Sequence, residues 1–268
     1  MEPITVLVHG VLGKMGKEVV AAISRDPELE LVGAVDVKAT QDHLTLPDGS
    51  KQVPLSTELS SILEICHPKV LLDFTIAEAA MAAARAALKK KISVVIGTSG
   101  LSEDNLKEIA QLSEANKVGA VVAPNFTIGA AVLLNAVKDA AKYFDYVDII
   151  EMHHHEKVDA PSGTALATAK AMLKSRSKPF LYSKTKKETL SGTRGGEIDG
   201  VTIHSVRLPG FVASQEVIFG GQGQTLSIRH DTIGRECYMP GVILAIKEVV
   251  NRKGLVYGLD TLLNLRGD

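Results

Sequence analysis

Short apolar runs alternate along the first half of the chain with stretches in which apolar residues recur every three or four positions. An uninterrupted apolar run is typical of a parallel strand buried on both faces, and the longer period is that of an amphipathic helix. Residues 37–57 are polar and rich in turn residues, so we expect a surface loop there. The predicted strands are residues 4–8, 29–36, 70–74, 93–97 and 118–123.

The pattern changes in the second half. A long apolar helix is predicted over residues 127–144, and a last apolar helix over residues 242–250 is expected to return to the first domain. Between them lie alternating, β-rich runs separated by short glycine turns, which is typical of an antiparallel sheet. These runs are residues 201–208, 213–220 and 224–230.

Together these patterns predict two domains. Strands that alternate with helices predict an α/β Rossmann-type parallel sheet domain, formed by residues 1–126 and 239–268. Residues 127–238 are expected to form an inserted α+β domain with a mixed or antiparallel sheet.

The composition is that of an ordinary globular protein. Of the 268 residues, 45% are hydrophobic and 23% are charged, and the net charge is −1. This balance gives no basis for binding nucleic acid or a membrane surface, and no apolar run is long enough to cross a bilayer. No secretory signal precedes the first strand, and Cys66 and Cys237 are expected to be small buried residues. We therefore expect a cytoplasmic protein, in the cytosol or an organelle stroma.

A glycine-rich turn follows the first predicted strand and precedes a helical pattern. Its sequence, H-G-V-L-G-K-M-G, places glycines at positions 10, 13 and 16. Strand, glycine turn and helix open a dinucleotide-binding unit, because glycine permits a tight turn and lets backbone N–H groups approach a pyrophosphate. Leu12 stands where the usual pattern has its second glycine, so the turn alone is a weak signal.

Three further strand ends support a dinucleotide site. Asp36 ends the second strand about twenty residues after the last glycine, where an acidic side chain binds the adenosine ribose. The fourth strand opens into G-T-S-G at residues 97–100, and the fifth into A-P-N-F at residues 123–126. The carboxyl ends of parallel strands line one crevice, so these loops are expected to face one cleft. Lys38 lies close enough to meet a 2′-phosphate, which leaves the choice between NADH and NADPH open.

The most distinctive stretch lies in the second domain. Residues 151–165 read E-M-H-H-H-E-K-V-D-A-P-S-G-T-A, with a strand predicted before them and a helix after them. A helix start offers unpaired backbone N–H groups and a partial positive charge, and Lys157 and the imidazoles lie close to it in sequence. This combination suits an anionic substrate that must also receive a proton. Ser162 is expected to cap the helix, because no G-x-S-x-G motif surrounds it.

Three adjacent histidines beside glutamates also suggest zinc. On a strand, Glu151, His153 and His155 would share one face, and the residues between them would share the other. Ligands on alternating faces do not converge on one ion, and Lys157 would repel a dication. We therefore expect no metal here, with a merely structural role for His153 as the other alternative.

These motifs resemble those of the 4-hydroxy-tetrahydrodipicolinate reductase family, long called dihydrodipicolinate reductase. The resemblance runs over nearly the whole chain and includes S-V-R-L-P-G-F-V-A-S-Q-E-V-I-F-G at residues 205–220. Its most specific element is E-x-H-H-x-x-K-x-D-A-P-S-G-T-A. The resemblance implies an oxidoreductase of lysine and diaminopimelate biosynthesis that uses NADPH or NADH. Its substrate would be a small cyclic imine with two carboxylates.

The resemblance also implies roles for individual residues. His153 would be the proton donor or acceptor and Lys157 a proton donor. The substrate would be held by His154, Gly163 and Thr164. Where some members carry an arginine after the acidic ribose ligand, this chain has Val37. The cofactor would be bound by Gly10, Val11, Leu12, Gly13, Lys14, Met15, Asp36, Gly97, Thr98, Ser99, Ala123, Pro124, Asn125 and Phe126.

The family resemblance further implies a homotetramer joined through the sheets of the second domain, although some plant members look dimeric. Two other classes of function stay open from the residues alone. One is another nicotinamide-dependent dehydrogenase built on the same two-domain plan. The other is a cofactor-binding sensor without turnover.

Overall fold

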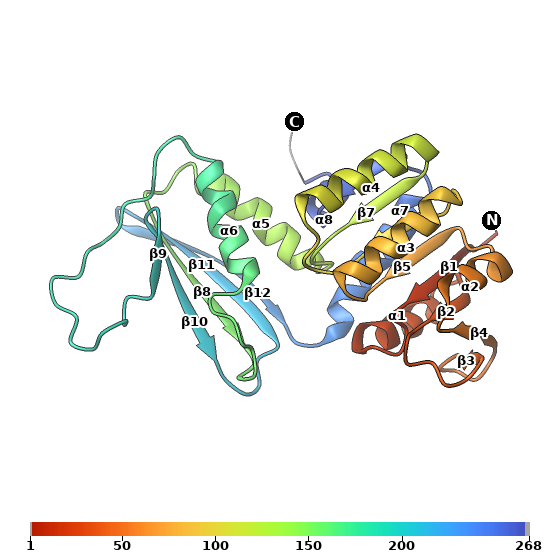
Figure 1. Cartoon of the computed structure of the whole chain (residues 1–268). Coiled ribbons are helices and arrows are strands. Elements are labelled where there is room, and N and C mark those ends of the chain that lie inside the picture. Colours follow the sequence, from red (N-terminus) through yellow and green to blue (C-terminus); the bar gives the residue numbers. More distant parts are fainter. Residues whose placement is uncertain (1, 266–268) are drawn as a thin grey trace. The chain divides into compact units, whose positions relative to one another are not determined.

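The computed structural model describes residues 2–265, which form two compact units (Figure 1). The discontinuous unit contains the residues up to Ile128 and those from Tyr238 onward, and the inserted unit is Gly129–Cys237. Each unit has its own sheet. In the described residues, no helix has the length and hydrophobicity needed to span a membrane.

The discontinuous unit is built on an eight-stranded sheet, counted over residues 2–265, in the order β13-β7-β6-β5-β1-β2-β4-β3. All neighbouring strands are parallel except β3 and β4. The strands are β1 (Ile4–His9), β2 (Leu29–Val35), β3 (His43–Thr45), β4 (Gln52–Ser56), β5 (Val70–Asp73), β6 (Ser93–Ile96), β7 (Gly119–Val122) and β13 (Gly254–Tyr257).

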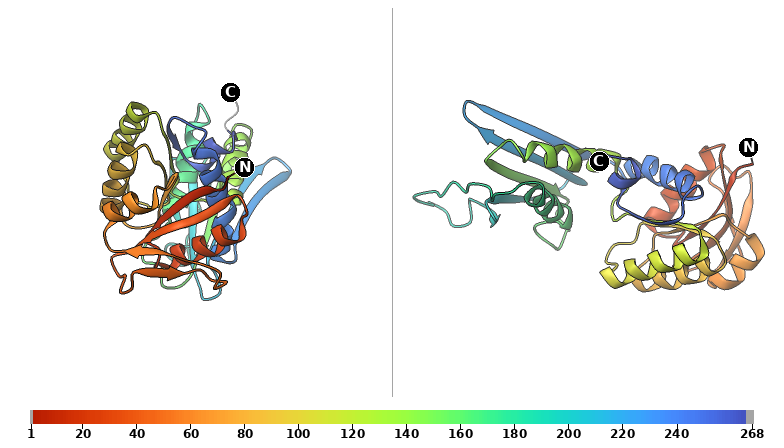
Figure 2. Two further views of the ribbon diagram at one scale, coloured as in Figure 1. Left: turned by 90° about the vertical axis from the view of Figure 1, so that its right-hand side faces the viewer. Right: turned by 90° about the horizontal axis from the view of Figure 1, so that it is seen from above.

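Helices cover both faces of this sheet (Figure 2). One face carries α2 (Leu59–Cys66), α3 (Ala77–Lys89) and α4 (Glu103–Asn116), and the other carries α1 (Lys14–Arg25), α7 (Met239–Val249) and α8 (Leu259–Leu262). Every residue of β5, β6 and β7 is buried, as expected for strands covered on both sides. The buried alanines of α3 have almost no side-chain bulk and let that helix lie close to the sheet.

The expected loop at residues 37–57 is wrong in part, because it contains β3 and β4. In β4, Val53 and Leu55 are buried and Pro54 between them is exposed, so the strand follows the two-residue period. Proline is disfavoured within strands and typical of loops or edge strands, so Pro54 made a loop the expected structure here. The edge strand β13 was also not predicted.

The inserted unit contains a five-stranded sheet, again counted over the described residues, in the order β12-β11-β8-β10-β9. Its strands are β8 (Tyr146–His153), β9 (Gly196–Ile198), β10 (Val201–Arg207), β11 (Ala213–Gly221) and β12 (Gln224–Thr232). The sheet is mixed, because β8 and β10 are parallel and the other pairs are antiparallel. A purely antiparallel sheet is therefore excluded in favour of the mixed alternative.

One face of the mixed sheet is covered by α5 (Ile128–Ala140) and α6 (Gly163–Lys174). Leu133, Val137, Ala169 and Met172 from these helices pack on Val147, Ile149, Val201, Ile203, Val217 and Phe219 from the sheet. α6 lies between β8 and β10 in sequence and supplies the crossover that parallel strands require. The helix therefore begins shortly after the end of β8. The two units together have the predicted architecture: a parallel Rossmann-type sheet and an inserted α+β unit.

Candidate functional site

The polar cluster of the inserted unit is assembled by strand register. In the parallel pair of β8 and β10, Glu151 lies opposite Ser205 and His153 lies opposite Arg207. The neighbouring antiparallel strand β11 places Ala213 opposite His153. Residues about fifty positions apart in the sequence are thereby brought together at the carboxyl ends of two adjacent strands.

Glu151 is the buried centre of this cluster, with none of its surface exposed. One carboxylate oxygen accepts hydrogen bonds from His153 Nδ1 at 2.5 Å and from an Arg207 Nη at 3.0 Å. The other accepts from the second Arg207 Nη at 2.7 Å and from the Ser162 backbone N–H at 3.3 Å. The Ser205 side chain also hydrogen-bonds to this carboxylate. Glu151 thus has donors from three separate segments of the chain.

The charge state of Glu151 follows from these contacts. Burial alone would raise the pKa of the carboxyl, but the hydrogen bonds from Arg207, Ser205 and His153 outweigh burial and lower the pKa below its ordinary value. Glu151 is therefore ionised at neutral pH. An ionised carboxylate only accepts hydrogen bonds, so the proton between it and the imidazole belongs to His153 Nδ1.

His153 is consequently held in one tautomer. When the ring is neutral, Nδ1 carries the proton and Nε2 presents a lone pair. Burial lowers the pKa of His153, the contact with Glu151 acts in the opposite direction, and the positive charges of Lys157 and Arg207 lower the pKa further. The net pKa lies below the ordinary histidine value, so the neutral ring with a basic Nε2 is the main form at neutral pH.

Lys157 lies in the turn that follows β8. Its ammonium group forms an ion pair with Asp159 at 2.6 Å, and its backbone N–H donates to the carbonyl of His154 at 3.2 Å. The ion pair with Lys157 is the main reason that the pKa of Asp159 lies below its ordinary value. Arg207 donates to the Asp159 carbonyl at 2.8 Å, so one guanidinium ties this turn to the Glu151 carboxylate.

The start of α6 completes the cluster. Ser162 is the N-cap, and its Oγ accepts a hydrogen bond from the Ala165 N–H at 3.1 Å, as predicted from the sequence. Gly163 and Thr164 form the exposed first turn, and a Cβ added at Gly163 would meet open space. The first-turn N–H groups of a helix have no intrahelical partner and carry a partial positive charge. This end of α6 is therefore suited to a carboxylate.

Of the remaining histidines in the cluster, His154 and His155 lie after the last residue of β8 and are exposed. Within residues 2–265, no group of three or more His, Cys, Asp or Glu side chains is placed to hold a metal ion.

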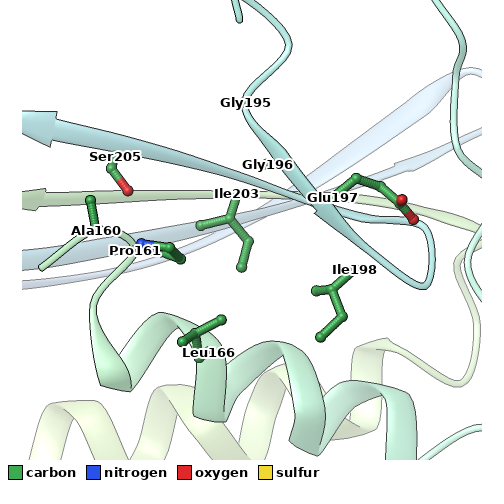
Figure 3. A pocket seen from close by; sticks show the side chains of 9 residues that line it. All are labelled: Ala160, Pro161, Leu166, Gly195, Gly196, Glu197, Ile198, Ile203 and Ser205. Atoms are coloured by element: carbon green, nitrogen blue, oxygen red, sulfur yellow. The ribbon is translucent and has the colours of Figure 1, made fainter.

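A pocket of about 580 Å³ adjoins the cluster in the inserted unit (Figure 3). Ser205, whose side chain hydrogen-bonds to Glu151, lies on its wall beside Ala160. Neither His153 nor Lys157 lines it. Its wall is mostly apolar, formed by Ala160, Pro161, Leu166, Gly195, Gly196, Glu197, Ile198, Ile203 and Ser205. The chemistry of this pocket does not match an anionic substrate, so we place the candidate site at the polar cluster instead.

The residues expected to bind the cofactor lie in the discontinuous unit. They follow β1, β2, β6 and β7, whose carboxyl ends lie at the same edge of the parallel sheet. The fold thus brings together the four predicted loops. Lys14 and Met15 belong to the first turn of α1 rather than to the loop itself.

The glycine turn has the close packing that a dinucleotide site requires. Gly10 has a φ of +83°, and a Cβ there would lie 2.8 Å from the Phe74 carbonyl oxygen. A Cβ on Gly16 would lie 2.3 Å from the Gly10 carbonyl oxygen. Only glycine fits either position, so the turn presents bare backbone. Such a turn before a helix is suited to a pyrophosphate.

Asp36 contributes to that turn directly. Its side chain is nearly buried, and its two oxygens accept hydrogen bonds from the backbone N–H groups of Leu12 at 2.8 Å and Lys38 at 2.9 Å. Each carboxylate oxygen can accept more than one hydrogen bond, so both retain capacity for ribose hydroxyls. Leu12 replaces the usual second glycine, and its N–H is nevertheless fixed by the acidic residue.

In the other two loops, several side chains are turned into the protein or bonded within it. The Thr98 hydroxyl donates to Asp73 at 2.6 Å and is turned into the protein, while Ser99 is exposed. In the A-P-N-F segment, Ala123 and Phe126 are buried and Pro124 is exposed. The Asn125 side chain accepts a hydrogen bond from the backbone N–H of Thr127, just before α5. The Thr98 hydroxyl is therefore already bonded within the protein, to Asp73 and to the Thr75 N–H.

Sequence reasoning did not assign several residues of the site. Glu151 was considered only as a zinc ligand, although it shares one strand face with His153 and the two-residue period gave that signal. Arg207 lies in the S-V-R-L-P-G motif, but its partner depends on the pairing of β8 with β10, which no local pattern reveals. No sequence pattern indicated a role in the site for Asp159 or Ser205.

Two family models match the chain in succession. The one described as dihydrodipicolinate reductase, N-terminus, matches residues 4–126, and the one described as dihydrodipicolinate reductase, C-terminus, matches residues 129–263.

Relatives match along the full length of the chain. The 4-hydroxy-tetrahydrodipicolinate reductase of Dehalococcoides mccartyi is 52% identical over 265 residues, which cover 99% of this chain and 100% of the relative. The protein of the same name from Moorella thermoacetica is 47% identical over 262 residues, with 97% and 98% covered.

A solved structure is similar over nearly the whole chain. Dihydrodipicolinate reductase from Paenisporosarcina sp. TG-14, with dipicolinate bound, is 41% identical and has a TM-score of 0.87, covering 97% of this chain and 99% of that chain. The chain therefore belongs to the dihydrodipicolinate reductase family.

The contacts of His153 predict that two substitutions shift its pKa in opposite directions. In Glu151→Gln the anion that stabilises the imidazolium is lost, so the pKa of His153 should fall further. In Arg207→Met the opposing cation is lost, so that pKa should rise. Both can be followed by NMR titration of ¹³C-labelled histidines in the full chain, with the His153 resonance assigned from the spectrum of His153→Gln.

Arg229→Met is the matched control, because Arg229 also forms ion pairs on this sheet, with Asp231 and Glu216, but does not contact Glu151. Its His153 titration should match that of the unmodified protein. A shift of the same sign in Glu151→Gln and Arg207→Met would contradict the electrostatic account.

Proposed function

We propose that the chain reduces 4-hydroxy-tetrahydrodipicolinate to tetrahydrodipicolinate with NADH or NADPH, as a step of lysine and diaminopimelate biosynthesis. The observation that carries this proposal is the oriented, neutral His153 beside Lys157 and the open start of α6. The names of the relatives support it, and so does the dipicolinate bound to the solved structure from Paenisporosarcina, because dipicolinate is also a ring with two carboxylates.

The positive groups of the cluster would hold the substrate. Lys157 and the first-turn N–H groups of Gly163 and Thr164 are suited to the carboxylates. His154 is exposed in the same turn as Lys157 and can donate a further hydrogen bond. Asp159 pairs with Lys157, so a substrate carboxylate would take over a contact that a protein carboxylate already makes.

The reaction needs one hydride and one proton. Loss of the 4-hydroxyl group as water leaves a conjugated system, to which the nicotinamide supplies a hydride at one end. A proton must then arrive at the other end. Lys157 carries three N–H donors, and we assign the donation to its ammonium group. Neutral His153 has a basic Nε2 and is suited to accept a proton and pass it on.

The discontinuous unit would hold the nicotinamide cofactor. The bare backbone of the glycine turn, residues 10–15, is suited to the pyrophosphate and Asp36 to the ribose hydroxyls. The loops at residues 97–99 and 123–126 end neighbouring strands of the same sheet. These assignments rest on the turn geometry and on the hydrogen-bonding capacity of Asp36.

Assembly is proposed through the sheet of the inserted unit. The face opposite α5 and α6 exposes parts of Ile150 and Ile218 beside the hydrogen-bonded pair Asp148–His204 and the ion pair Glu216–Arg229. A half-apolar sheet face with fixed charges is suited to pack on a second copy. We propose a homotetramer joined through this face, in the cytoplasm, where the free thiols of Cys66 and Cys237 would stay reduced.

The catalytic roles predict that His153→Gln and Lys157→Ala each lower turnover by about two orders of magnitude or more, because each removes a group that moves a proton. Turnover is measured as substrate-dependent NADH oxidation with freshly prepared 4-hydroxy-tetrahydrodipicolinate. NADH binding, measured by fluorescence, should be kept in both variants. Lys170→Ala, an exposed lysine of α6, is the control and should retain full activity.

Unchanged turnover in both variants would overturn the assigned roles. Oxidation of NADH only with other amino or hydroxy acids would favour a different dehydrogenase, and NADH binding without turnover of any substrate would favour a sensor.

Cofactor choice can be tested at Val37, which is 80% exposed next to Asp36. Val37→Arg introduces a charged donor for a 2′-phosphate. One hydrogen bond between charged groups should lower the KM for NADPH by about tenfold or more, with little change for NADH. Val37→Gln has similar reach without charge and should leave the NADH to NADPH ratio nearly unchanged. An equal effect of both variants would show that charge at this position does not select the cofactor.

The assembly predicts a solution mass about four times the chain mass of 28.5 kDa. Ile218→Arg places a charge on the proposed sheet face and should yield a smaller species in size-exclusion chromatography with light scattering. Tyr143→Arg, at a position that is 83% exposed, should leave the mass unchanged. A monomeric unmodified protein, or an Ile218→Arg variant of unchanged mass, would contradict the proposed interface.

A further inference from the structure

The discontinuous unit contains a second fully buried carboxylate, Asp73, at the end of β5. It accepts hydrogen bonds from His9 Nδ1 at 2.6 Å and from the Thr98 hydroxyl at 2.6 Å. The backbone N–H and the hydroxyl of Thr75 donate to it at 3.1 and 3.0 Å. The Thr98 hydroxyl in turn accepts from the Thr75 N–H at 3.0 Å, which closes the network.

Two of the donors to Asp73, His9 and Thr98, lie next to or within the loops proposed to hold the cofactor. β5 lies between β1 and β6 in the sheet. His9 is the last residue of β1 and directly precedes Gly10, and Thr98 is the second residue of the G-T-S-G loop after β6. The carboxylate therefore joins the glycine turn on one side to the G-T-S-G loop on the other.

Phe74, the residue after Asp73, packs against the same two loops. A Cβ on Gly97 would lie 2.1 Å from the Phe74 ring, so the G-T-S-G loop rests directly on that ring. The Phe74 carbonyl oxygen lies against Gly10, and its ring packs on the edge of Phe126 with centroids 6.0 Å apart. One short segment thus touches all three of the loops that end β1, β6 and β7.

Burying a carboxylate without water is unfavourable, and it becomes tolerable only when hydrogen bonds satisfy the group. Here the donors come from the end of β1, from the G-T-S-G loop and from Thr75 just after β5. Moving the glycine turn together with His9, or moving the G-T-S-G loop, would therefore take one of these hydrogen bonds away from a buried carboxylate. The network therefore makes displacement of these loops costly before any ligand is present.

We propose that Asp73, acting through His9 and Thr98, is a positioning residue that holds the glycine turn and the G-T-S-G loop in the geometry that binds the nicotinamide cofactor. The inference rests on the proposed function and deepens it. It gives the Thr98 hydroxyl a different role from direct cofactor contact. Loops that are ordered in advance lower the cost of binding, so the network acts on cofactor affinity more than on the chemical step.

The test compares variants of Thr98 in the full chain. Thr98→Val keeps the shape but removes the hydroxyl, and the dissociation constant for NADH, measured by fluorescence titration, should rise about tenfold, the loss expected for one hydrogen bond to a charged group. Thr98→Ser keeps the hydroxyl and should bind within about twofold of the unmodified protein. Turnover at saturating NADH should change by less than about threefold in both.

Asp73→Asn should weaken NADH binding at least as much as Thr98→Val, because it affects both loops. Ser113→Ala is the matched control for lost stability, since Ser113 is a fully buried hydroxyl of α4 bonded to the Ala110 carbonyl. It should leave NADH affinity unchanged, whatever its effect on the melting temperature. Dipicolinate binding, measured by calorimetry, should be the same in all four variants.

Equal NADH affinity in Thr98→Val and the unmodified protein would overturn the inference, as would equal losses in Thr98→Val and Thr98→Ser. If Asp73→Asn does not fold, the two Thr98 variants still decide the matter. Failure of the unmodified protein to bind either NADH or NADPH would contradict the proposed function itself, which separates the two outcomes.

Discussion

The inserted unit depends on one interaction, the pairing of the buried Glu151 carboxylate with Arg207 and His153. A carboxylate without access to water requires several donors, and here they come from β8, β10 and the start of α6. Satisfying this one group therefore fixes the tautomer of His153, the turn that carries Lys157 and the cap of the helix. The same contacts keep Glu151 ionised and His153 neutral, so geometry and charge state have one cause.

The topology explains why the cluster forms at this place. β8 and β10 are parallel, so their connection must cross over the sheet, and α6 is that crossover. The helix has to begin near the end of β8, which places its positive end beside the histidines and Lys157. In an antiparallel pair the end of β10 would lie at the other end of β8, and Arg207 could not reach Glu151. A single parallel pair in a mixed sheet thus determines the candidate active site.

Much of the fold could be predicted from the sequence, because the buried strands β1, β5, β6 and β7 are continuous apolar runs and the glycine turn identifies the first strand–helix unit. The motif at residues 151–165 located the candidate site for the same reason: its signals are local. What could not be predicted depends on contacts between distant segments. The partner of Arg207 follows from strand register, the inward turn of the Thr98 hydroxyl follows from Asp73, and β4 was hidden by Pro54.

Each unit therefore contains a buried carboxylate at the end of a strand, Glu151 in one and Asp73 in the other. Buried ion pairs often add little to stability, since well-packed apolar residues of similar size can replace them without loss. These buried carboxylates must then contribute something that an apolar contact cannot, namely a defined orientation of the groups that donate to them. A carboxylate accepts only from donors at defined positions, so it fixes His153 and Arg207 in the inserted unit and His9 and Thr98 in the discontinuous unit. Apolar packing would hold the same segments together without fixing which way their polar atoms face, and both the proposed proton transfer and the proposed cofactor loops require that orientation.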